Sequence, residues 1–206
     1  MDTIIFNYSK HLNTSSDINQ HLPTLAAYAT ECESIIELGV RGCISSWAFC
    51  YGLINNNKDT KKLFLNDIKP CDISELLEAS KSPEVNIDAS FQWINDLNIC
   101  TDNLETDLTF IDTWHVYAQL KRELEKFSKI TKKYIIMHDT VVDGVDGETI
   151  RCGWDAEKQS EDSGFPVNEI KCGLVPAIKE FLQNNDDWIL YYHYENNNGL
   201  TILKRI

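Results

Sequence analysis

Four side chains that can exchange protons lie at the ends of two apolar runs. Asp112 and His115 come at and just after the end of one run, and His138 and Asp139 at and just after the end of another. A histidine titrates near neutrality and becomes a better base when a carboxylate orients its ring. The residues predict a site that removes a proton from a hydroxyl. His115 is the expected base, Asp112 and Asp139 are orienting groups, and His138 is a second candidate base.

Each of these residues also has a plain structural explanation. His138 is equally explained as a buried histidine that holds the end of a strand, and His115 as a solvent-facing residue in the first turn of a helix. Trp114, between Asp112 and His115, either packs against that helix or forms one wall of an acceptor pocket. The remaining histidines have no neighbouring motif and are expected to be structural.

A glycine-containing turn follows the first apolar run. Gly39 and Gly42 stand three apart between an expected strand and an expected helix, where the backbone can pass close to a ligand. The dinucleotide-binding fingerprint would place a third glycine where Glu37 stands. A carboxylate there disfavours a pyrophosphate and favours a cationic ligand without phosphate. The alternative is a tight turn with no ligand. Arg41, inside this turn, is expected to make a local salt bridge, and its alternative role is contact with an anionic group on an acceptor.

Asp67 ends the second apolar run, about thirty residues after Glu37. A carboxylate at the tip of the second strand is placed to accept both ribose hydroxyls of an adenosine moiety. The alternative is a solvated aspartate at a strand end. Taken together, Glu37, the glycine turn and Asp67 favour the binding of an adenosine moiety.

These residues need a sheet to position them. Strands are expected at Ser34–Leu38, Lys62–Asp67, Phe91–Ile94, Leu108–Asp112 and Tyr134–His138. Helices are expected at Cys43–Ile54, Ile73–Ser80, His115–Phe127 and Leu174–Gln183. Apolar strands that alternate with helices are typical of a parallel sheet covered on both faces.

The end of the chain follows another pattern. Trp188–Tyr194 and Leu200–Lys204 are expected strands joined through Asn198 and Gly199, which is a strong hairpin signal. The predicted fold is therefore Rossmann-like α/β, a mostly parallel seven-stranded sheet with a C-terminal antiparallel hairpin and helices on both faces.

The whole chain, residues 1–206, is expected to form one domain. Residues 1–30 are predicted as an N-terminal helical cap, with Ser16 or Asp17 as the N-cap of a helix that ends near Thr30. Residues 143–168 are rich in glycine and acids. A segment of this length is either a functional lid, here over an acceptor, or a disordered surface loop.

The composition limits the partners. The 206 residues carry 32 acidic and 19 basic side chains, a formal net charge of −13, which argues against nucleic acid or an anionic membrane as the main partner. Seven cysteines without a CxxC pair are expected to be reduced thiols in a cytoplasmic protein. The first ten residues lack the pattern of a secretory signal, and no window is apolar enough for a transmembrane helix.

The motifs together resemble the class I S-adenosylmethionine-dependent methyltransferases, over roughly residues 16–206. The resemblance is carried by ELGVRG at 37–42, LND at 65–67, TDLTFIDTWHVYAQLKREL at 106–124, YIIMHDT at 134–140 and NNNGLTILKR at 196–205. It implies S-adenosylmethionine as cofactor, with Glu37, Gly39 and Gly42 near the methionine part and Asp67 on the ribose. Asp96, or its neighbour Asn95, would face the adenine, and Asp112 lies beside the expected sulfonium.

The ends of the fourth and fifth strands resemble the metal-assisted O-methyltransferases of the catechol type. That resemblance implies Mg²⁺ held by Asp112 and Asp139, although Thr140 stands where the pattern has asparagine. The segments around His115 and His138 are also similar to enzymes that methylate sugars, including the macrolide-sugar and cephalosporin hydroxylase-like groups.

The resulting expectation is O-methylation of a sugar hydroxyl in a glycan or glycoconjugate. The alternatives are a catecholic or phenolic acceptor, and a non-catalytic nucleotide-binding module of the same fold.

Overall fold

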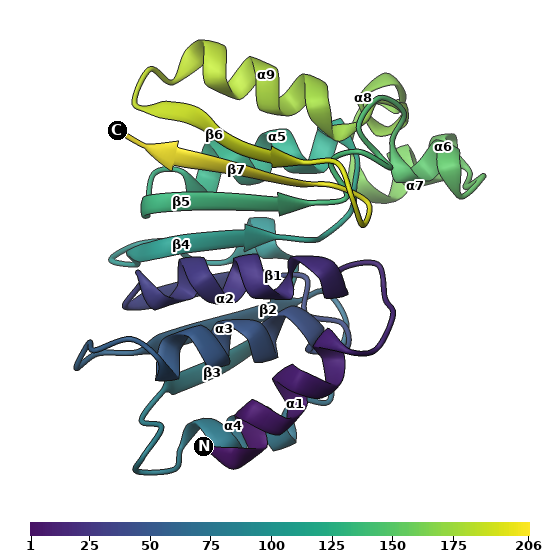
Figure 1. Ribbon diagram of the computed structural model, residues 1–206. Coiled ribbons are helices and arrows are strands. Elements are labelled where there is room, and N and C mark those ends of the chain that lie inside the picture. The colour runs from purple at the N-terminus through teal and green to yellow at the C-terminus, as the bar shows by residue number, and fades with distance from the viewer. The chain divides into compact units, whose positions relative to one another are not determined.

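The computed structural model describes all 206 residues, and the chain divides into two compact units, Met1–Ile111 and Asp112–Ile206 (Figure 1). The first unit contains helices α1 (Asp2–Leu12), η1 (Asn19–His21), α2 (Leu22–Thr30), α3 (Ile44–Ile54), α4 (Ser74–Ser80) and η2 (Asp96–Asn98). Its strands are β1 (Ser34–Leu38), β2 (Lys62–Asp67), β3 (Asp88–Trp93) and β4 (Thr106–Ile111).

The strands of the first unit follow the order β3-β2-β1-β4, and all three pairings are parallel. Within β1 every residue after Ser34 is buried, and β4 is buried throughout. Such strands are apolar on both faces because helices cover both sides of a parallel sheet. The buried Ile35 and Ile36 of β1 therefore point to opposite faces of one sheet.

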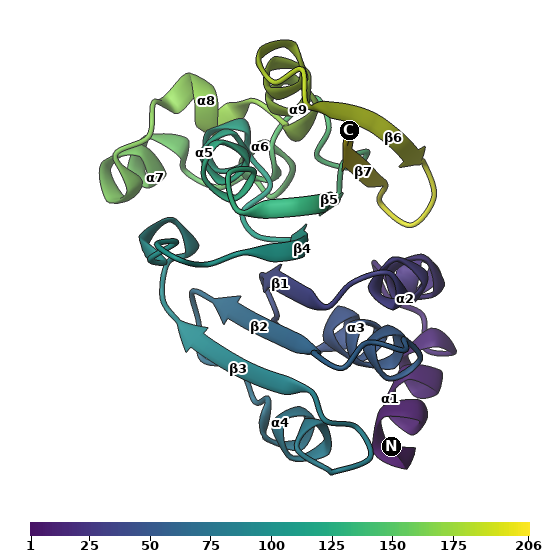
Figure 2. The ribbon, with the colours of Figure 1, turned by 90° about the vertical axis from the view of Figure 1, so that its left-hand side faces the viewer.

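Helices α2 and α3 lie side by side on one face of these strands (Figure 2). Their close approach depends on Gly52 in α3. A Cβ atom at this position would lie 2.3 Å from the carbonyl oxygen of Ala26 and 2.4 Å from Cβ of Ala29, both in α2. The two helices therefore touch through backbone and small side chains.

Replacing Gly52 by alanine should lower the free energy of unfolding by about 2 kcal/mol, because the added methyl group must push α2 and α3 apart. Urea denaturation followed by circular dichroism measures this change. Gly42→Ala is the matched control, since nothing lies within 4 Å of a Cβ at that position. Equal stability of Gly52→Ala and the parent chain would contradict the close helix contact.

The second unit contains α5 (Tyr117–Phe127), α6 (Glu148–Arg151), α7 (Ala156–Ser163), α8 (Val167–Lys171) and α9 (Leu174–Asn184). Its strands β5 (Thr131–His138), β6 (Trp188–Tyr194) and β7 (Leu200–Arg205) follow the order β5-β7-β6 with antiparallel pairings. The turn between β6 and β7 contains Asn197, Asn198 and Gly199, all with positive φ. These residue types accept the left-handed conformation that a tight hairpin turn requires.

Residues 143–168 are largely helical, because α6, α7 and the start of α8 lie in this segment (Figure 1). The base of the segment is closed by an antiparallel bridge between Asp146 and Cys172, and by a hydrogen bond from Gly147 N–H to the Lys171 carbonyl at 3.0 Å. Ala156 and Ile170 pack in a buried cluster with Val116 and Ala118. The expectation of a disordered loop is therefore wrong.

The strands β1, β2 and β6 have the predicted bounds, whereas β3, β4 and β5 begin two or three residues earlier than predicted. Their first residues, Asp88, Thr106 and Thr131, are polar, so the apolar pattern does not mark them. Helix α5 begins at Tyr117 because Val116 is extended (φ −133°, ψ 152°). His115 consequently lies in the loop before α5 and not in a helix.

The amino-terminal region is helical, as predicted, but is divided differently. Helix α1 was not foreseen as a separate element. The prediction of Ser16 or Asp17 as an N-cap is wrong, because Ile18 precedes η1 and His21 precedes α2, and neither caps its helix through a side chain. The Oγ of Ser16 instead accepts the N–H of Asn19 at 3.0 Å.

The predicted fold class is confirmed. The structure has a seven-stranded sheet of mixed direction with an antiparallel hairpin at the carboxyl end of the chain. All seven cysteines are free thiols. No helix of the structure is long and apolar enough to cross a membrane.

Candidate functional site

The second unit brings His115 together with the predicted acids. Its Nε2 atom lies 3.1 Å from Oδ1 of Asp112, and its Nδ1 lies 3.0 Å from Oδ2 of Asp139. A third carboxylate, that of Asp143, lies 3.1 Å from the same Nδ1. The His115 side chain is only 12% exposed, so the expectation of a solvent-facing residue is wrong.

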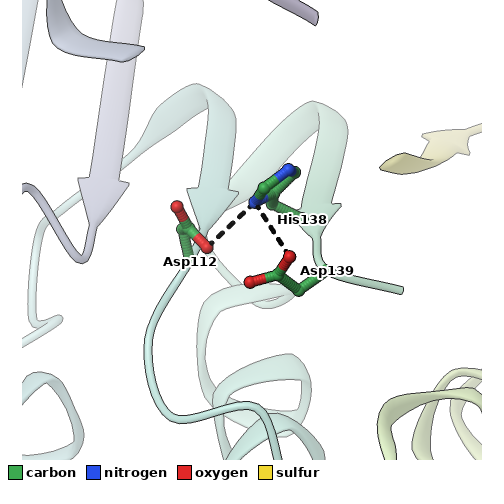
Figure 3. Close-up of side chains that lie close together, drawn as sticks. All are labelled: Asp112, His138 and Asp139. Atoms are coloured by element: carbon green, nitrogen blue, oxygen red, sulfur yellow. Dashed lines mark hydrogen bonds and ion pairs between the residues drawn. The ribbon is translucent and has the colours of Figure 1, made fainter. Parts of the chain in front are cut away.

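His138 joins the same cluster from the end of β5. Its Nδ1 lies 3.3 Å from Oδ1 of Asp112 and 3.6 Å from Oδ1 of Asp139, and both carboxylates point toward that nitrogen (Figure 3). On the other side of the ring, Nε2 lies 3.2 Å from the carbonyl oxygen of Asn197 in the hairpin turn. The side chain is buried, so His138 both holds the strand end and contacts the acids.

The chain direction changes sharply just after β5, and this places the acids. Asp139 has a left-handed backbone (φ 56°), which aspartate tolerates better than most residues. The next turn closes with a hydrogen bond from Asp143 N–H to the Asp139 carbonyl at 3.0 Å, while Val141 and Val142 donate to the Asn198 carbonyl. Asp139 and Asp143 therefore stand one turn apart and face the same imidazole.

The acids determine the charge of both imidazoles. Burial lowers the pKa of His115, but hydrogen bonds to Asp112, Asp139 and Asp143 outweigh this effect and hold the pKa well above its usual value. Burial likewise lowers the pKa of His138, and the contact with Asp112 raises it overall. Burial raises the pKa of Asp112, but its bonds to the two rings bring it below its usual value. An unperturbed pKa for His115, which the sequence suggested, is therefore wrong.

Sequence reasoning missed Asp143 and Arg151. Asp143 is fully buried, and the guanidinium of Arg151 holds its carboxylate through two atoms, Nε at 2.6 Å and Nη2 at 2.8 Å. Arg151 is also 3.7 Å from Glu148. The four-residue spacing of Asp139 and Asp143 was a usable signal, since residues four apart share one face of a helical turn. Nothing in the sequence indicated Arg151, because it depends on the fold of α6.

Replacing Arg151 by alanine should lower the free energy of unfolding by about 2 kcal/mol, because the buried carboxylate of Asp143 loses its bidentate partner. Arg151→Lys should recover part of this loss. Lys158→Ala is the matched control on α7, where an exposed ion pair of 3.7 Å to Asp162 contributes less than about 0.5 kcal/mol. Thermal unfolding of the three variants measures the differences, and equal losses for Arg151→Ala and Lys158→Ala would contradict the assignment.

Trp114 packs within the second unit. Its ring stacks on that of Phe165, with 6.2 Å between the ring centroids. The guanidinium carbon of Arg122 lies over the Phe165 ring, 4.3 Å from its centroid. Trp114 also packs against the buried cluster around Val116. The packing alternative is therefore confirmed, and through Phe165 the residue anchors the segment 143–168.

The first unit forms the glycine turn as predicted. Gly39 has φ 87° and donates its N–H to the Asn66 carbonyl at 2.9 Å. No atom lies within 4 Å of a Cβ built on Gly42, so the turn is open at this point. Arg41 makes the expected local salt bridge, 2.7 Å from Asp17.

Asp67 organises this turn. Its Oδ2 accepts the N–H groups of Val40 at 3.0 Å and Arg41 at 2.9 Å, and its Oδ1 accepts that of Lys69 at 2.8 Å. A carboxylate has about four acceptor positions, and three are taken by these N–H groups, so one remains for a ribose hydroxyl. Beyond β3, Asn95 caps η2 by accepting the Leu97 N–H, and Asp96 is buried.

Glu37 is fully buried in β1, and its Oε1 accepts a short hydrogen bond from the hydroxyl of Ser45 in α3. A buried carboxylate is costly unless it is well bonded or meets a cation. Its position two residues before Gly39 agrees with the predicted cationic ligand.

No family model and no curated protein matches the chain. Among solved structures, it is similar to the O-methyltransferase TomG from Streptomyces achromogenes, involved in tomaymycin synthesis and solved with S-adenosylmethionine. The identity is 14% and the TM-score 0.61, over 100% of this chain and 90% of that one.

Two further structures were solved with S-adenosylhomocysteine. A methyltransferase from Podospora anserina is 13% identical with a TM-score of 0.60, over 100% of this chain and 88% of that one. An O-methyltransferase from Bacillus cereus is 14% identical with a TM-score of 0.57, over 100% and 89%. The chain therefore has the fold of the class I S-adenosylmethionine-dependent methyltransferases.

Proposed function

We propose that the protein is an S-adenosylmethionine-dependent O-methyltransferase that acts on a small molecule. One observation carries the proposal. The imidazoles of His115 and His138 each lie 3.0 to 3.6 Å from both of two carboxylates, those of Asp112 and Asp139, on a methyltransferase fold. Transfer to oxygen requires removal of a proton from the acceptor, and this cluster supplies the groups for it.

The first unit offers a donor set that fits the cofactor. Glu37, Gly39 and Gly42 would hold the methionine part, Asp67 the ribose, and Asn95 or Asp96 the adenine side. Asp112, which begins the second unit, is the further contact that the sequence motifs imply. The open space at Gly42 and the buried carboxylate of Glu37 support this assignment. When bound, the cofactor supplies a methyl group on a positively charged sulfur.

Within the cluster, the hydrogen bonds define a role for each ring. The Nδ1–H of His115 is held by Asp139 and Asp143, so Nε2, which is hydrogen-bonded to Asp112, is the atom that would take the proton of an acceptor hydroxyl placed between them. Asp112, 3.1 Å from Nε2, orients that hydroxyl. His138 remains the second candidate base.

A divalent metal fits part of this cluster. Asp112 and Asp139 are the proposed ligands, and Oδ1 of Asp139 is a buried carboxylate oxygen that makes no hydrogen bond in the structure. A bound ion would supply a positive charge that favours an ionised acceptor hydroxyl. If the metal is required, EDTA should abolish turnover.

Two classes of acceptor are candidates. The sequence motifs favour the hydroxyl of a sugar. A phenolic hydroxyl is the second candidate, supported by exposed apolar side chains that follow the cluster in the chain: Val141, Val142, Val145, Ile150 and Trp154. Apolar surface next to a polar site suits an aromatic acceptor.

Calorimetry with S-adenosylhomocysteine tests cofactor binding, and methyl transfer from labelled S-adenosylmethionine to parallel panels of sugars and phenols tests the acceptor. We expect cofactor binding in the micromolar range and transfer to one panel. No binding at high micromolar ligand would contradict the enzyme and leave the non-catalytic module. Binding without transfer to either panel would contradict both acceptor classes.

A further inference from the structure

We propose that Asp112, His138 and Asp139 bind a divalent transition-metal ion, from Mn²⁺ to Zn²⁺, in preference to Mg²⁺. The three side chains each offer one ligand atom, and these atoms lie within 4.8 Å of one another (Figure 3). The proposal deepens the metal role in the proposed function and rests on it. Its new element is the imidazole of His138 as a ligand.

The hydrogen bonds of His138 favour a ring that is ready to bind metal. Nε2 faces the carbonyl oxygen of Asn197, which can only accept, so Nε2 carries the hydrogen. In the neutral ring Nδ1 then presents a lone pair to the oxygens of Asp112 and Asp139. A lone pair and two carboxylates repel one another, so this arrangement favours a cation among them, either a proton on Nδ1 or a metal ion in its place.

The distances between Nδ1 of His138 and the two carboxylates are closer to those between ligands of one metal ion than to those of hydrogen bonds. Nδ1 lies 3.3 Å from Asp112 Oδ1 and 3.6 Å from Asp139 Oδ1. Charge-assisted hydrogen bonds are about 2.7–2.9 Å long. Two ligands of one tetrahedral ion, each about 2.0–2.2 Å from it, are about 3.3–3.6 Å apart. Asp139 Oδ1 is also buried without a hydrogen bond, and the left-handed backbone of Asp139 fixes its direction.

The ligand types indicate the kind of ion. Mg²⁺ prefers oxygen ligands in an octahedron, whereas imidazole nitrogen favours the later ions of the first transition row. Thr140 does not supply the missing oxygen, because it is buried and its hydroxyl accepts a hydrogen bond from Thr201 at 2.8 Å. One nitrogen and two carboxylates therefore select a transition-metal ion.

A second group of candidate ligands, His115, Asp139 and Asp143, is less suited to a metal. The carboxylate of Asp143 is already neutralised by Arg151 through two hydrogen bonds. Nδ1 of His115 lies 3.0 and 3.1 Å from the two carboxylates, which is explained by a shared proton. The geometry therefore favours the group around His138.

Calorimetry on the whole, metal-stripped chain tests the proposal with Mn²⁺ and Mg²⁺ alone. Neither cofactor nor acceptor is present, so a failure here is distinct from a failure of methyl transfer. We expect Mn²⁺ to bind at least about tenfold more tightly than Mg²⁺. His138→Asn should lose about tenfold or more in Mn²⁺ affinity, while its affinity for Mg²⁺ changes little.

His193→Asn is the matched control, because His193 is an exposed histidine in β6 of the same unit, and it should keep the parent affinities. Equal affinity of the parent chain for both ions, or an unchanged Mn²⁺ affinity in His138→Asn, overturns the proposal. Loss of Mn²⁺ binding in Asp143→Asn but not in His138→Asn also overturns it, by placing the ion in the other group.

Pulsed electron paramagnetic resonance keeps the test independent of how the variants fold. Mn²⁺ bound to the parent chain should show coupling to an imidazole nitrogen, and His193→Asn should show the same coupling. Bound Mn²⁺ without nitrogen coupling would exclude His138 as a ligand.

Discussion

His115→Ala is expected to reduce kcat at least about a hundredfold while the affinity for S-adenosylhomocysteine stays within about twofold of the parent chain. The imidazole is the only group that contacts Asp112, Asp139 and Asp143 together, so no neighbour can replace it as the proton acceptor. Single-turnover methyl transfer and calorimetry measure the two quantities.

The parent enzyme should show a matching dependence on pH. Because the carboxylates hold the pKa of His115 well above its usual value, the neutral ring that can accept a proton becomes more abundant as the pH rises. The rate should therefore increase from neutral to alkaline pH. In His115→Ala this part of the profile should disappear.

The loss of His115 also leaves three carboxylates close together, so the alanine variant is paired with His115→Asn, which retains a hydrogen-bond donor. His193→Ala serves as control for the loss of a histidine outside the cluster. If His115→Asn turned over at the parent rate, His115 would not be the base, and His138 would become the candidate. Circular dichroism confirms that each variant is folded.

Glu37→Gln should weaken S-adenosylhomocysteine binding about tenfold to a hundredfold, which corresponds to the loss of one hydrogen bond to a charged group. The substitution keeps the shape of the side chain and its contact with Ser45. It removes a buried negative charge, whose desolvation opposes folding. The melting temperature of the variant should therefore equal or exceed that of the parent chain.

If Glu37→Gln raised the stability of the chain and lowered its affinity for S-adenosylhomocysteine, Glu37 would have a binding role and not a purely structural one. Glu33→Gln is the matched control, because Glu33 lies just before the same strand, with its side chain 49% exposed and in an ion pair with Lys58. Equal effects of the two substitutions on affinity would contradict the assignment of Glu37. Binding is measured by calorimetry and stability by thermal unfolding.

The sheet could be predicted from the sequence because each strand is short, apolar and bounded by a turn signal. Ser34–Leu38 and Trp188–Tyr194 have the predicted bounds, and Asn198 with Gly199 marks the hairpin. The acids and histidines at the strand ends were found for the same reason, since their positions follow from where the strands stop.

The region that surrounds His115 could not be predicted in this way. Residues 143–168 carry few apolar residues, and their helices are stabilised by contacts such as Phe165 on Trp114 and Arg151 on Asp143. These contacts join residues that the sequence does not mark as partners. The raised pKa of His115 depends on Asp143 in the same way, so local pattern alone suggested an ordinary base.

The closed base of the segment 143–168 allows the outer part of this segment, and with it the acceptor specificity, to change separately from the rest of the fold. The chain leaves and re-enters the fold at adjacent points, through the bridge between Asp146 and Cys172. Glu148 N–H is bonded to the His115 carbonyl, and Tyr117 N–H to that of Cys172, so the base also fixes the loop that carries the imidazole. The outer part, around α7, can therefore be exchanged or lengthened by grafting without moving the loop that carries His115, provided that the residues of the base are retained.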